Sequence, residues 1–323
     1  MRIGEIELGA GAALAPMAGV SDTAMRRLCA RHGALFTVSE MVSAKALTMN
    51  DKKSRALLRG GGGAAPYGVQ LFGHEPAVLA EAVLRIEDEA FDFLDINMGC
   101  PAPKICGHGD GSGLLKDPPL AGEMARAAVR ASVRPVTAKL RIGWDDEVMT
   151  GLEVARRCEE AGVQLLCVHG RTRAQQYVPG VNLDAVAAIR QAVGIPVLFN
   201  GDVDSGAAAV AAVAKTGCAG VMIGRAAVGD PFLFDRVKAA LEGRPEPPLP
   251  TLRERLATLD VQVQGMCEEK GEERAMREAR KVAAGYMRGL AGAAALRRCA
   301  HSLTFYTDLQ ELAQLAWQNN PAC

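Results

Sequence analysis

Eight short apolar runs alternate with longer helical patterns through the first three quarters of this 323-residue chain, and no other feature limits its fold as strongly. Strands that alternate with helices predict βαβ units and a parallel sheet, and eight such units predict a closed (β/α)8 TIM barrel in the α/β class. The runs that predict the strands are Ala12–Met17, Leu35–Ser39, Tyr67–Phe72, Phe93–Asn97, Val136–Arg141, Leu165–His169, Val197–Asn200 and Gly220–Ile223.

Helical periodicity fills most of the intervals between these runs. The predicted helices are Thr23–His32, Pro76–Glu89, Pro119–Ser132, Val148–Ala161, Leu183–Val193 and Ser205–Thr216. The connection Ala44–Leu58 shows no clear pattern. The glycine run Gly60–Gly63 predicts a flexible surface loop. A phosphate-binding loop is disfavoured there, because a strand rather than a helix follows and no helix dipole is supplied.

The chain changes character after the eighth run. A helix is predicted through Leu241, and the stretch Glu242–Pro250, which contains four prolines, predicts a stiff linker. Thr251-Leu252-Arg253-Glu254 has the sequence of a capping box, and helical periodicity without strand signals continues from there to Leu315. We therefore expect a barrel domain of residues 1–244 and a small all-helical domain of residues 245–323.

The overall charge gives no sign of a nucleic-acid partner, since 37 basic residues balance 37 acidic ones. The segment Met276–Arg298 differs, because it holds six basic residues and one acidic residue. Many such runs are merely solvated helix faces, so the cluster alone is a weak signal. The nine cysteines are scattered without a CxxC pair, and no export signal or membrane span is evident. These features predict reduced thiols, no metal site and a cytoplasmic protein.

A barrel enzyme carries its chemistry at the carboxyl ends of its strands, so the residues at those ends are the candidates for a site. Cys100 stands between Gly99 and Pro101 just after the fourth predicted strand, on a tight turn that would aim its thiol outward. A buried structural cysteine is the alternative, and the local sequence does not separate the two interpretations.

Lys139 interrupts the apolar fifth strand, where a lysine must find a polar partner or leave a buried charge unpaired. An outward lysine that extends past a helix is one interpretation, and an anionic ligand in the barrel mouth is the one we favour. His169 ends the neighbouring strand. A lone histidine is more often structural, but this position favours contact with a ligand.

The last two strands form the usual phosphate site of this fold. Asn200-Gly201-Asp202 brings backbone N–H groups to that place, and Gly224-Arg225 adds more backbone and a guanidinium. Either segment alone is more simply an ordinary turn, but the two together predict a phosphate site. Arg171 and Arg173 follow the sixth strand, where an extended polyanion can reach them. Solvated loop arginines are an equal alternative.

Taken together, these motifs resemble those of the tRNA-dihydrouridine synthase family of FMN-dependent enzymes. The motifs that carry the resemblance are Leu14-Ala15-Pro16-Met17-Ala18-Gly19-Val20-Ser21-Asp22, Val69-Gln70-Leu71-Phe72-Gly73, Asn97-Met98-Gly99-Cys100-Pro101, Ala138-Lys139-Leu140-Arg141-Ile142-Gly143, His169-Gly170-Arg171-Thr172-Arg173, Asn200-Gly201-Asp202 and Ile223-Gly224-Arg225. The tail motifs Arg280–Tyr286, Gly289-Leu290 and Leu296-Arg297 resemble the bacterial B-type branch. The chain departs from that branch at Lys281-Val282, where a basic-His pair is usual.

The resemblance implies an NADPH-dependent enzyme that reduces specific uridines of tRNA to 5,6-dihydrouridine. It implies that reduced FMN gives a hydride to C6 of uracil and that Cys100 protonates C5. The residues implied to hold FMN are Pro16, Met17, Ala18, Gln70, Lys139, His169, Asn200, Gly201, Asp202, Gly224 and Arg225. Those implied to hold the uracil or the tRNA are Asn97, Arg141, Arg171, Arg173, Arg280 and Lys281. The resemblance also implies a monomer without a protein partner.

Two other interpretations stay open at this point. The chain would be an FMN-dependent barrel that reduces a free pyrimidine or another small molecule, or a non-catalytic RNA-binding protein that kept a barrel scaffold. A small-molecule enzyme has no need of the basic tail. The presence of Cys100 and Lys139 speaks against a protein without catalytic activity.

Overall fold

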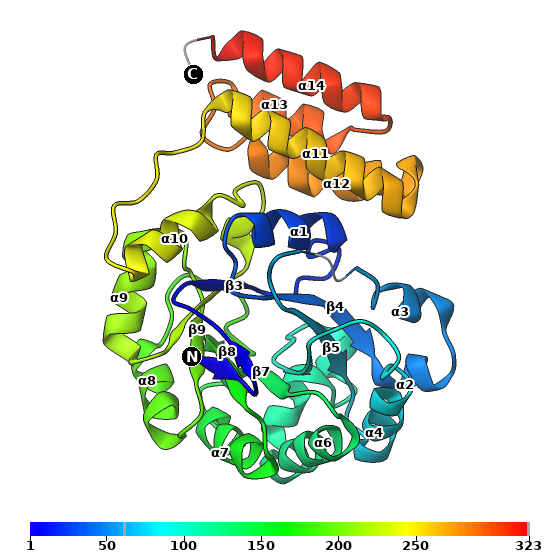
Figure 1. Ribbon diagram of the computed structural model, residues 1–323, viewed down its shortest axis with the longest axis vertical. Coiled ribbons are helices and arrows are strands. Elements are labelled where there is room, and N and C mark those ends of the chain that lie inside the picture. The colour runs from blue at the N-terminus through cyan, green and yellow to red at the C-terminus, as the bar shows by residue number, and fades with distance from the viewer. Residues whose placement is uncertain (61–62, 322–323) are drawn as a thin grey trace.

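A computed structural model describes residues 1–60 and 63–321, and its centre is a closed barrel of eight parallel strands (Figure 1). The strands pair around the barrel in the order β10-β3-β4-β5-β6-β7-β8-β9. Their bounds are β3 Ala12–Leu14, β4 Thr37–Ser43, β5 Tyr67–Phe72, β6 Phe93–Met98, β7 Val136–Gly143, β8 Leu165–Thr172, β9 Val197–Asn200 and β10 Gly220–Ile223. The predicted (β/α)8 barrel is therefore confirmed.

Helices surround the barrel, as the alternating pattern predicts (Figure 1). The α-helices between β3 and the proline-rich linker are α1 Thr23–Arg31, α2 Ala44–Thr48, α3 Lys52–Ala56, α4 Pro76–Leu84, α5 Pro103–Cys106, α6 Pro118–Ala131, α7 Gly151–Ala161, α8 Leu183–Ala192, α9 Gly206–Thr216 and α10 Leu233–Leu241. Two 3-10 helices, η1 Gly111–Lys116 and η2 Arg225–Ala227, follow β6 and β10. The connection Ala44–Leu58 thus contains the short helices α2 and α3, which lack the length for a clear periodic pattern.

Several predicted strand bounds change in ways that matter for the site. β3 ends at Leu14, so Pro16 and Met17 lie in the loop that follows it rather than in the strand. β4 continues to Ser43, past the polar Glu40, through an irregularity between Val38 and Met41. The glycine-run prediction falls partly on residues 61 and 62, which lie outside the described residues.

A two-stranded hairpin, β1 (Arg2–Ile3) and β2 (Ile6–Glu7), precedes the barrel and was not predicted, because its strands are only two residues long. Ile3 is fully buried in a cluster with Phe36 and Phe93, whose rings meet edge to face at a centroid distance of 5.2 Å. Apolar side chains near the amino ends of the strands thus form a packed core inside the barrel. The carboxyl ends of the strands are the place where a site is expected.

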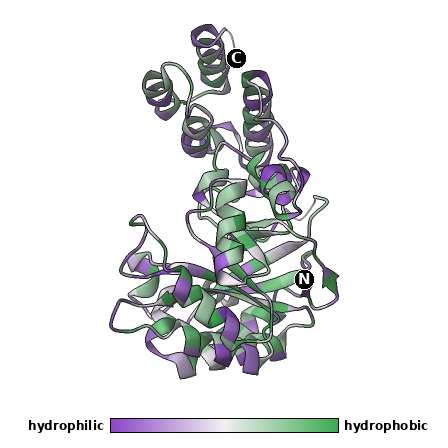
Figure 2. Ribbon diagram, turned by 90° about the vertical axis from the view of Figure 1, so that its left-hand side faces the viewer, coloured by the Kyte–Doolittle hydropathy of each residue, from purple (hydrophilic) through white to green (hydrophobic). Residues whose placement is uncertain are grey.

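Four helices follow the proline-rich linker and stand together on one side of the barrel (Figure 1 and Figure 2). They are α11 Leu252–Lys270, α12 Glu272–Tyr286, α13 Ala293–His301 and α14 Tyr306–Asn319. The predicted capping box is present, because the Thr251 hydroxyl accepts from the Glu254 N–H while the Glu254 carboxylate accepts from the Thr251 N–H. The helices bury their own apolar cluster, to which Ala24 of α1 also belongs. The boundary of a separate domain at residue 245 remains a prediction.

Within residues 1–60 and 63–321, no helix has both the length and the apolar composition that crossing a membrane requires. The same residues contain no group of three or more His, Cys, Asp or Glu side chains arranged to hold a metal ion.

Candidate functional site

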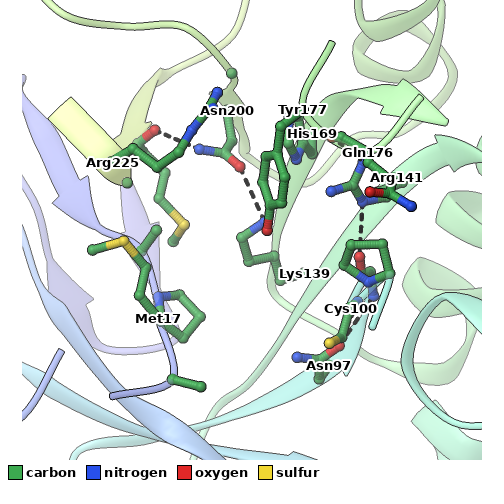
Figure 3. A pocket seen from close by; sticks show the side chains of 18 of the residues that line it. Met17, Asn97, Cys100, Lys139, Arg141, His169, Gln176, Tyr177, Asn200 and Arg225 are labelled. Carbon is green, nitrogen blue, oxygen red and sulfur yellow. Dashed lines mark hydrogen bonds between the residues drawn. The ribbon is translucent and has the colours of Figure 1, made fainter. Parts of the chain in front are cut away.

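A cavity of about 950 Å³ opens at the carboxyl ends of the barrel strands, and it collects most of the residues singled out in the sequence (Figure 3). The predicted residues that line it are Pro16, Met17, Ala18, Gln70, Asn97, Cys100, Lys139, Arg141, His169, Asn200, Gly201, Asp202, Gly224 and Arg225. They come from strand ends and loops far apart in the sequence, because a closed parallel barrel brings all of its carboxyl ends to one rim.

The Cys100 turn is held from several sides. The Asn97 side-chain oxygen accepts from the N–H of Gly99 at 3.1 Å and from the N–H of Cys100 at 3.0 Å. The Ser112 hydroxyl donates to the Cys100 carbonyl at 2.8 Å. Gly111 packs so closely that an added Cβ would lie 3.0 Å from the Cβ of Cys100, and its φ of +55° also favours glycine. The thiol therefore projects from a fixed turn at the cavity wall.

Cys100 is only partly exposed, and burial raises the pKa of its thiol, although the N–H of Ala102 and the nearby Arg141 and Lys139 oppose the rise. A raised pKa keeps the thiol protonated through neutral pH. The group is therefore suited to donate a proton, and less suited to act as a thiolate nucleophile.

Lys139 extends from β7 into the middle of the cavity (Figure 3). Its ammonium donates to the Asn200 side-chain oxygen at 3.1 Å, and the Asn200 side-chain nitrogen donates in turn to the Met222 carbonyl at 2.8 Å. Burial lowers the pKa of Lys139. An ammonium has three protons, and one hydrogen bond leaves others free to meet an anionic ligand atom. Lys139 therefore points into the cavity rather than outward past a helix, and an anionic ligand beside it stays a prediction.

Arg141 lines the same cavity but gives most of its hydrogen bonds to the protein. The side chain is 2% exposed, and its guanidinium donates to the carbonyls of Gly99 at 2.8 Å, Thr172 at 2.9 Å and Gln176 at 3.1 Å. Burial lowers its pKa to about 10. Arg141 therefore joins the Cys100 turn to the loop after β8, and a contact with RNA stays a prediction.

Arg171 occupies a different position from the one expected of a phosphate-binding side chain. It is completely buried, donates to the Val178 carbonyl at 2.6 Å and forms an ion pair with Asp202. No part of its side chain reaches solvent, so Arg171 lies behind the cavity wall and holds Asp202, and this position does not support its predicted contact with RNA phosphate. The predicted sixth strand ends at His169 and leaves Arg171 in a loop, whereas β8 continues to Thr172 and places Arg171 within the strand.

Asp202 joins two arginines at the predicted phosphate site. Burial opposes ionisation of its carboxyl group, but the hydrogen bond from Arg171 and the charges of Arg171 and Arg225 lower its pKa overall. Arg225 pairs with Asp202 at 3.2 Å and is largely exposed at the rim. His169 lies beside Arg171, and burial together with the surrounding cations lowers its pKa far below the usual range, so its ring is neutral at neutral pH.

The predicted tRNA contacts in the tail and in the loop after β8 do not line the cavity. Arg173 lies over the ring of Trp144, 4.3 Å from its centroid. Arg280 donates to the Leu303 carbonyl at 2.9 Å, and Lys281 is exposed on the same helix. The tail residue that does line the cavity is Arg288, which the sequence identified only as one member of the basic cluster.

Met41 and Tyr177 also line the cavity, and sequence reasoning missed both. Met41 was missed because the polar Glu40 interrupts the apolar run, so the predicted strand ends at Ser39. Tyr177 lies in an irregular loop that carries no periodic signal. Its ring is half-exposed, with the guanidinium carbon of Arg225 at 4.8 Å and that of Arg141 at 5.8 Å from its centroid.

Comparison with known proteins agrees with the motifs. Residues 13–320 match the Dihydrouridine synthase (Dus) family. The chain is 43% identical to tRNA-dihydrouridine synthase B of Pseudomonas aeruginosa over 304 residues, which cover 92% of this chain and 90% of that protein. It is 36% identical to a probable tRNA-dihydrouridine synthase of Rickettsia conorii in an alignment of 329 residues, gaps included, which covers 98% of this chain and 99% of that protein.

Among solved structures, histamine dehydrogenase from Rhizobium sp. superposes with a TM-score of 0.58 at 14% sequence identity. The match covers 82% of this chain and 50% of that one. At this identity the likeness concerns the barrel fold alone. The family match and the two relatives confirm the resemblance drawn from the sequence motifs, and the Pseudomonas aeruginosa relative supports the B-type branch.

Proposed function

Since this chain belongs to the dihydrouridine synthase family, we propose that it reduces uridines in tRNA to 5,6-dihydrouridine, with FMN as its bound cofactor and NADPH as the reductant. The observation that carries the proposal is a cavity with the Cys100 thiol on one wall, the Lys139 ammonium in the middle and the exposed Arg225 guanidinium at the opposite side. A proton donor, a fixed cation and an anion site are what this reaction requires of the protein.

The residues of the cavity fit FMN. Its volume of about 950 Å³ is in the range of cofactor pockets. At one side, Gly201 and Gly224 have no side chains, so a phosphate can approach their backbone closely. The exposed guanidinium of Arg225 can bind the phosphate through two parallel hydrogen bonds. Lys139 offers its free ammonium protons near the centre, where the flavin ring would lie. Pro16, Met17 and Ala18 would line the ring from the loop after β3.

Bound FMN would supply the hydride that reduces C6 of the uracil, after NADPH has returned it to the reduced state. Cys100 would donate its thiol proton to C5, and the raised pKa of the thiol keeps that proton available. Asn97 would help to position the uracil beside Cys100. Lys139 would stabilise the negative charge that develops on the flavin ring when it is reduced, without itself exchanging a proton. The neutral ring of His169 would add a hydrogen bond to the same cofactor.

The target uracil must leave its stack to enter the cavity, which loop bases of tRNA do at low cost. We propose that the four tail helices, as a domain of residues 245–323, hold the tRNA against the barrel mouth with Arg280, Lys281 and Arg288. Arg288 supports this arrangement, because it belongs to the tail and yet lines the cavity. Arg141 and Arg173 would meet phosphates on the barrel side. We expect the enzyme to act as a cytoplasmic monomer.

The test is mass spectrometry of tRNA from cells that lack this protein. We expect one or more dihydrouridines to become uridine, and the wild-type gene to restore them, whereas the Cys100→Ala gene restores little. The gene for Cys299→Ala, a change at an exposed tail cysteine, is the matched control and should restore them fully. Unchanged dihydrouridine in the deletion strain, together with reduction of free uracil by the purified protein, would instead support a small-molecule reductase.

A further inference from the structure

A carboxylate lies beneath the site in a position that the proposed reaction does not use. Asp95 of β6 is 4% exposed and stands two residues before Asn97. One of its oxygens accepts from the Thr137 hydroxyl at 2.6 Å, and the other accepts from the Gln70 side-chain nitrogen at 2.6 Å. Burial raises the pKa of Asp95, whereas these two hydrogen bonds and the charge of Lys139 oppose the rise.

The hydrogen bonds continue from Asp95 to the Cys100 turn. The Gln70 side-chain oxygen accepts from the Asn97 side-chain nitrogen at 2.8 Å. The Asn97 oxygen then accepts from the N–H groups of Gly99 and Cys100 at 3.1 and 3.0 Å. Gln70 is fixed at its own backbone too, where its N–H donates to the Ser39 hydroxyl at 2.9 Å. An unbroken chain of side chains thus links a buried carboxylate to the turn that carries the thiol.

The order of donors and acceptors along this chain of hydrogen bonds is set by its two ends. An ionised carboxylate can only accept hydrogen bonds, and the two backbone N–H groups of the turn can only donate them. The amides of Gln70 and Asn97 each have a donor and an acceptor end, so they satisfy both ends of the chain in one orientation. If either amide turned over, a donor would face a donor or an acceptor would face an acceptor.

We propose that Asp95 is a positioning residue, whose carboxylate fixes the orientation of the Gln70 and Asn97 amides and thereby holds the Cys100 turn. Asp95 touches neither the cavity nor the reacting atoms, and it acts through the two amides. The effect on catalysis rests on the proposed function, since it needs Cys100 to be the proton donor. The effect on the geometry of the turn does not depend on what the protein reduces.

The test compares Asp95→Asn with Thr137→Val, each on the full-length protein. The Asp95→Asn change keeps the size of the side chain but introduces a donor that can turn the Gln70 amide over. The Thr137→Val change removes the hydrogen bond to the other oxygen of Asp95 and leaves the chain toward Cys100 complete. Gln70→Met is a second variant that breaks the chain at its middle, and it serves if Asp95→Asn does not fold.

The first readout is the rate at which iodoacetamide alkylates Cys100 in the absence of tRNA, followed by peptide mass spectrometry. We expect the rate to rise at least fivefold in Asp95→Asn and Gln70→Met, because the Asn97 amide is no longer held with its oxygen toward the turn, and to stay within twofold of wild type in Thr137→Val. The fully buried Cys29 and Cys158 should stay unlabelled in every variant, which reports an intact fold.

The second readout is kinetic. For Asp95→Asn we expect kcat on tRNA to fall at least tenfold while KM for tRNA changes less than twofold, because the variant alters the turn and not the tRNA surface. Unchanged alkylation of Cys100 in the folded variants would overturn the proposal, and so would an equal rise in Thr137→Val. Faster alkylation in a protein that does not reduce tRNA would uphold the positioning of the turn and refute the proposed function.

Discussion

Replacement of Lys270 by methionine is expected to weaken the attachment of the tail helices to the barrel. Lys270 ends α11, and its side chain is 8% exposed. Its ammonium donates to Asp22 at 2.6 Å, just before α1 of the barrel, and to Glu278 of α12 at 2.5 Å. One cation therefore joins three elements, and methionine would leave two partly buried carboxylates without it.

The magnitude follows from this burial. Removal of one partner from a buried ion pair costs about 3–5 kcal/mol. Asp22 keeps its hydrogen bond from the Met25 N–H, and Glu278 keeps its bond from Arg274, so we expect the lower value of about 3 kcal/mol. Since 1.36 kcal/mol corresponds to a factor of ten, this is about a hundredfold in the equilibrium for local opening.

Hydrogen exchange followed by mass spectrometry measures that opening directly. We expect amides of α1, α11 and α12 to exchange about a hundredfold faster in Lys270→Met than in wild type. The matched control is Lys281→Met, an exposed lysine on α12, which should change exchange by less than about threefold. Equal exchange in the two variants would refute the account of Lys270 as the ionic link between the tail and barrel.

The same link has a defined pH dependence. Burial lowers the pKa of Lys270, but the charges and hydrogen bonds of Asp22 and Glu278 outweigh burial, and the pKa lies above its ordinary value of 10.5. A cation whose pKa is raised by folding stabilises the folded state fully below the unfolded value. The difference in exchange between wild type and Lys270→Met should therefore persist through neutral pH, and shrink only as the pH passes above 10.5.

Three further predictions concern the site. Because burial raises the pKa of Cys100 above its ordinary value of 9.0, a single-turnover rate on tRNA should stay level to about pH 9 and fall above it; a fall centred near pH 7 would contradict the thiol as donor. Lys139→Met should slow flavin reduction by NADPH about a hundredfold in stopped-flow measurements, since it removes the fixed charge in the cavity, and a rate within threefold of wild type would exclude that role. Arg288→Ala should lower the slope of log K for tRNA against log salt by about 1, whereas Arg126→Ala, on the outer surface of α6, should leave the slope unchanged; equal slopes would remove Arg288 from the tRNA surface.

The order of elements and the rim of the barrel could be predicted because both depend on local pattern. Apolar runs such as Tyr67–Phe72 and Gly220–Ile223 have the bounds in the structure that the sequence predicts. Closure of the barrel then brings the strand ends together, so Cys100 and Lys139 meet in one cavity although α5, η1 and α6 lie between them in the sequence.

The parts that could not be predicted depend on contacts between distant segments. The apolar run that predicts the sixth strand ends at His169, so Arg171 is expected in an exposed loop. Only its contacts with Val178 and Asp202, which follow β8 and β9, show that it is a buried residue of β8. The approach of Arg288 to the cavity depends on how the tail helices pack against the barrel, which no local pattern encodes. The chain of hydrogen bonds from Asp95 through Gln70 to Asn97 likewise depends on the register of β5 against β6, which pairs Gln70 with Asp95.

The most direct measurement of the central claim is an anaerobic single-turnover experiment on the purified protein reconstituted with FMN and reduced by NADPH. On mixing with unmodified tRNA, we predict that the visible flavin absorbance returns as dihydrouridine forms, and that Cys100→Ala, with FMN still bound, is slower by about a hundredfold. A protein that binds no FMN, or a Cys100→Ala variant that forms dihydrouridine at the wild-type rate, would contradict the account.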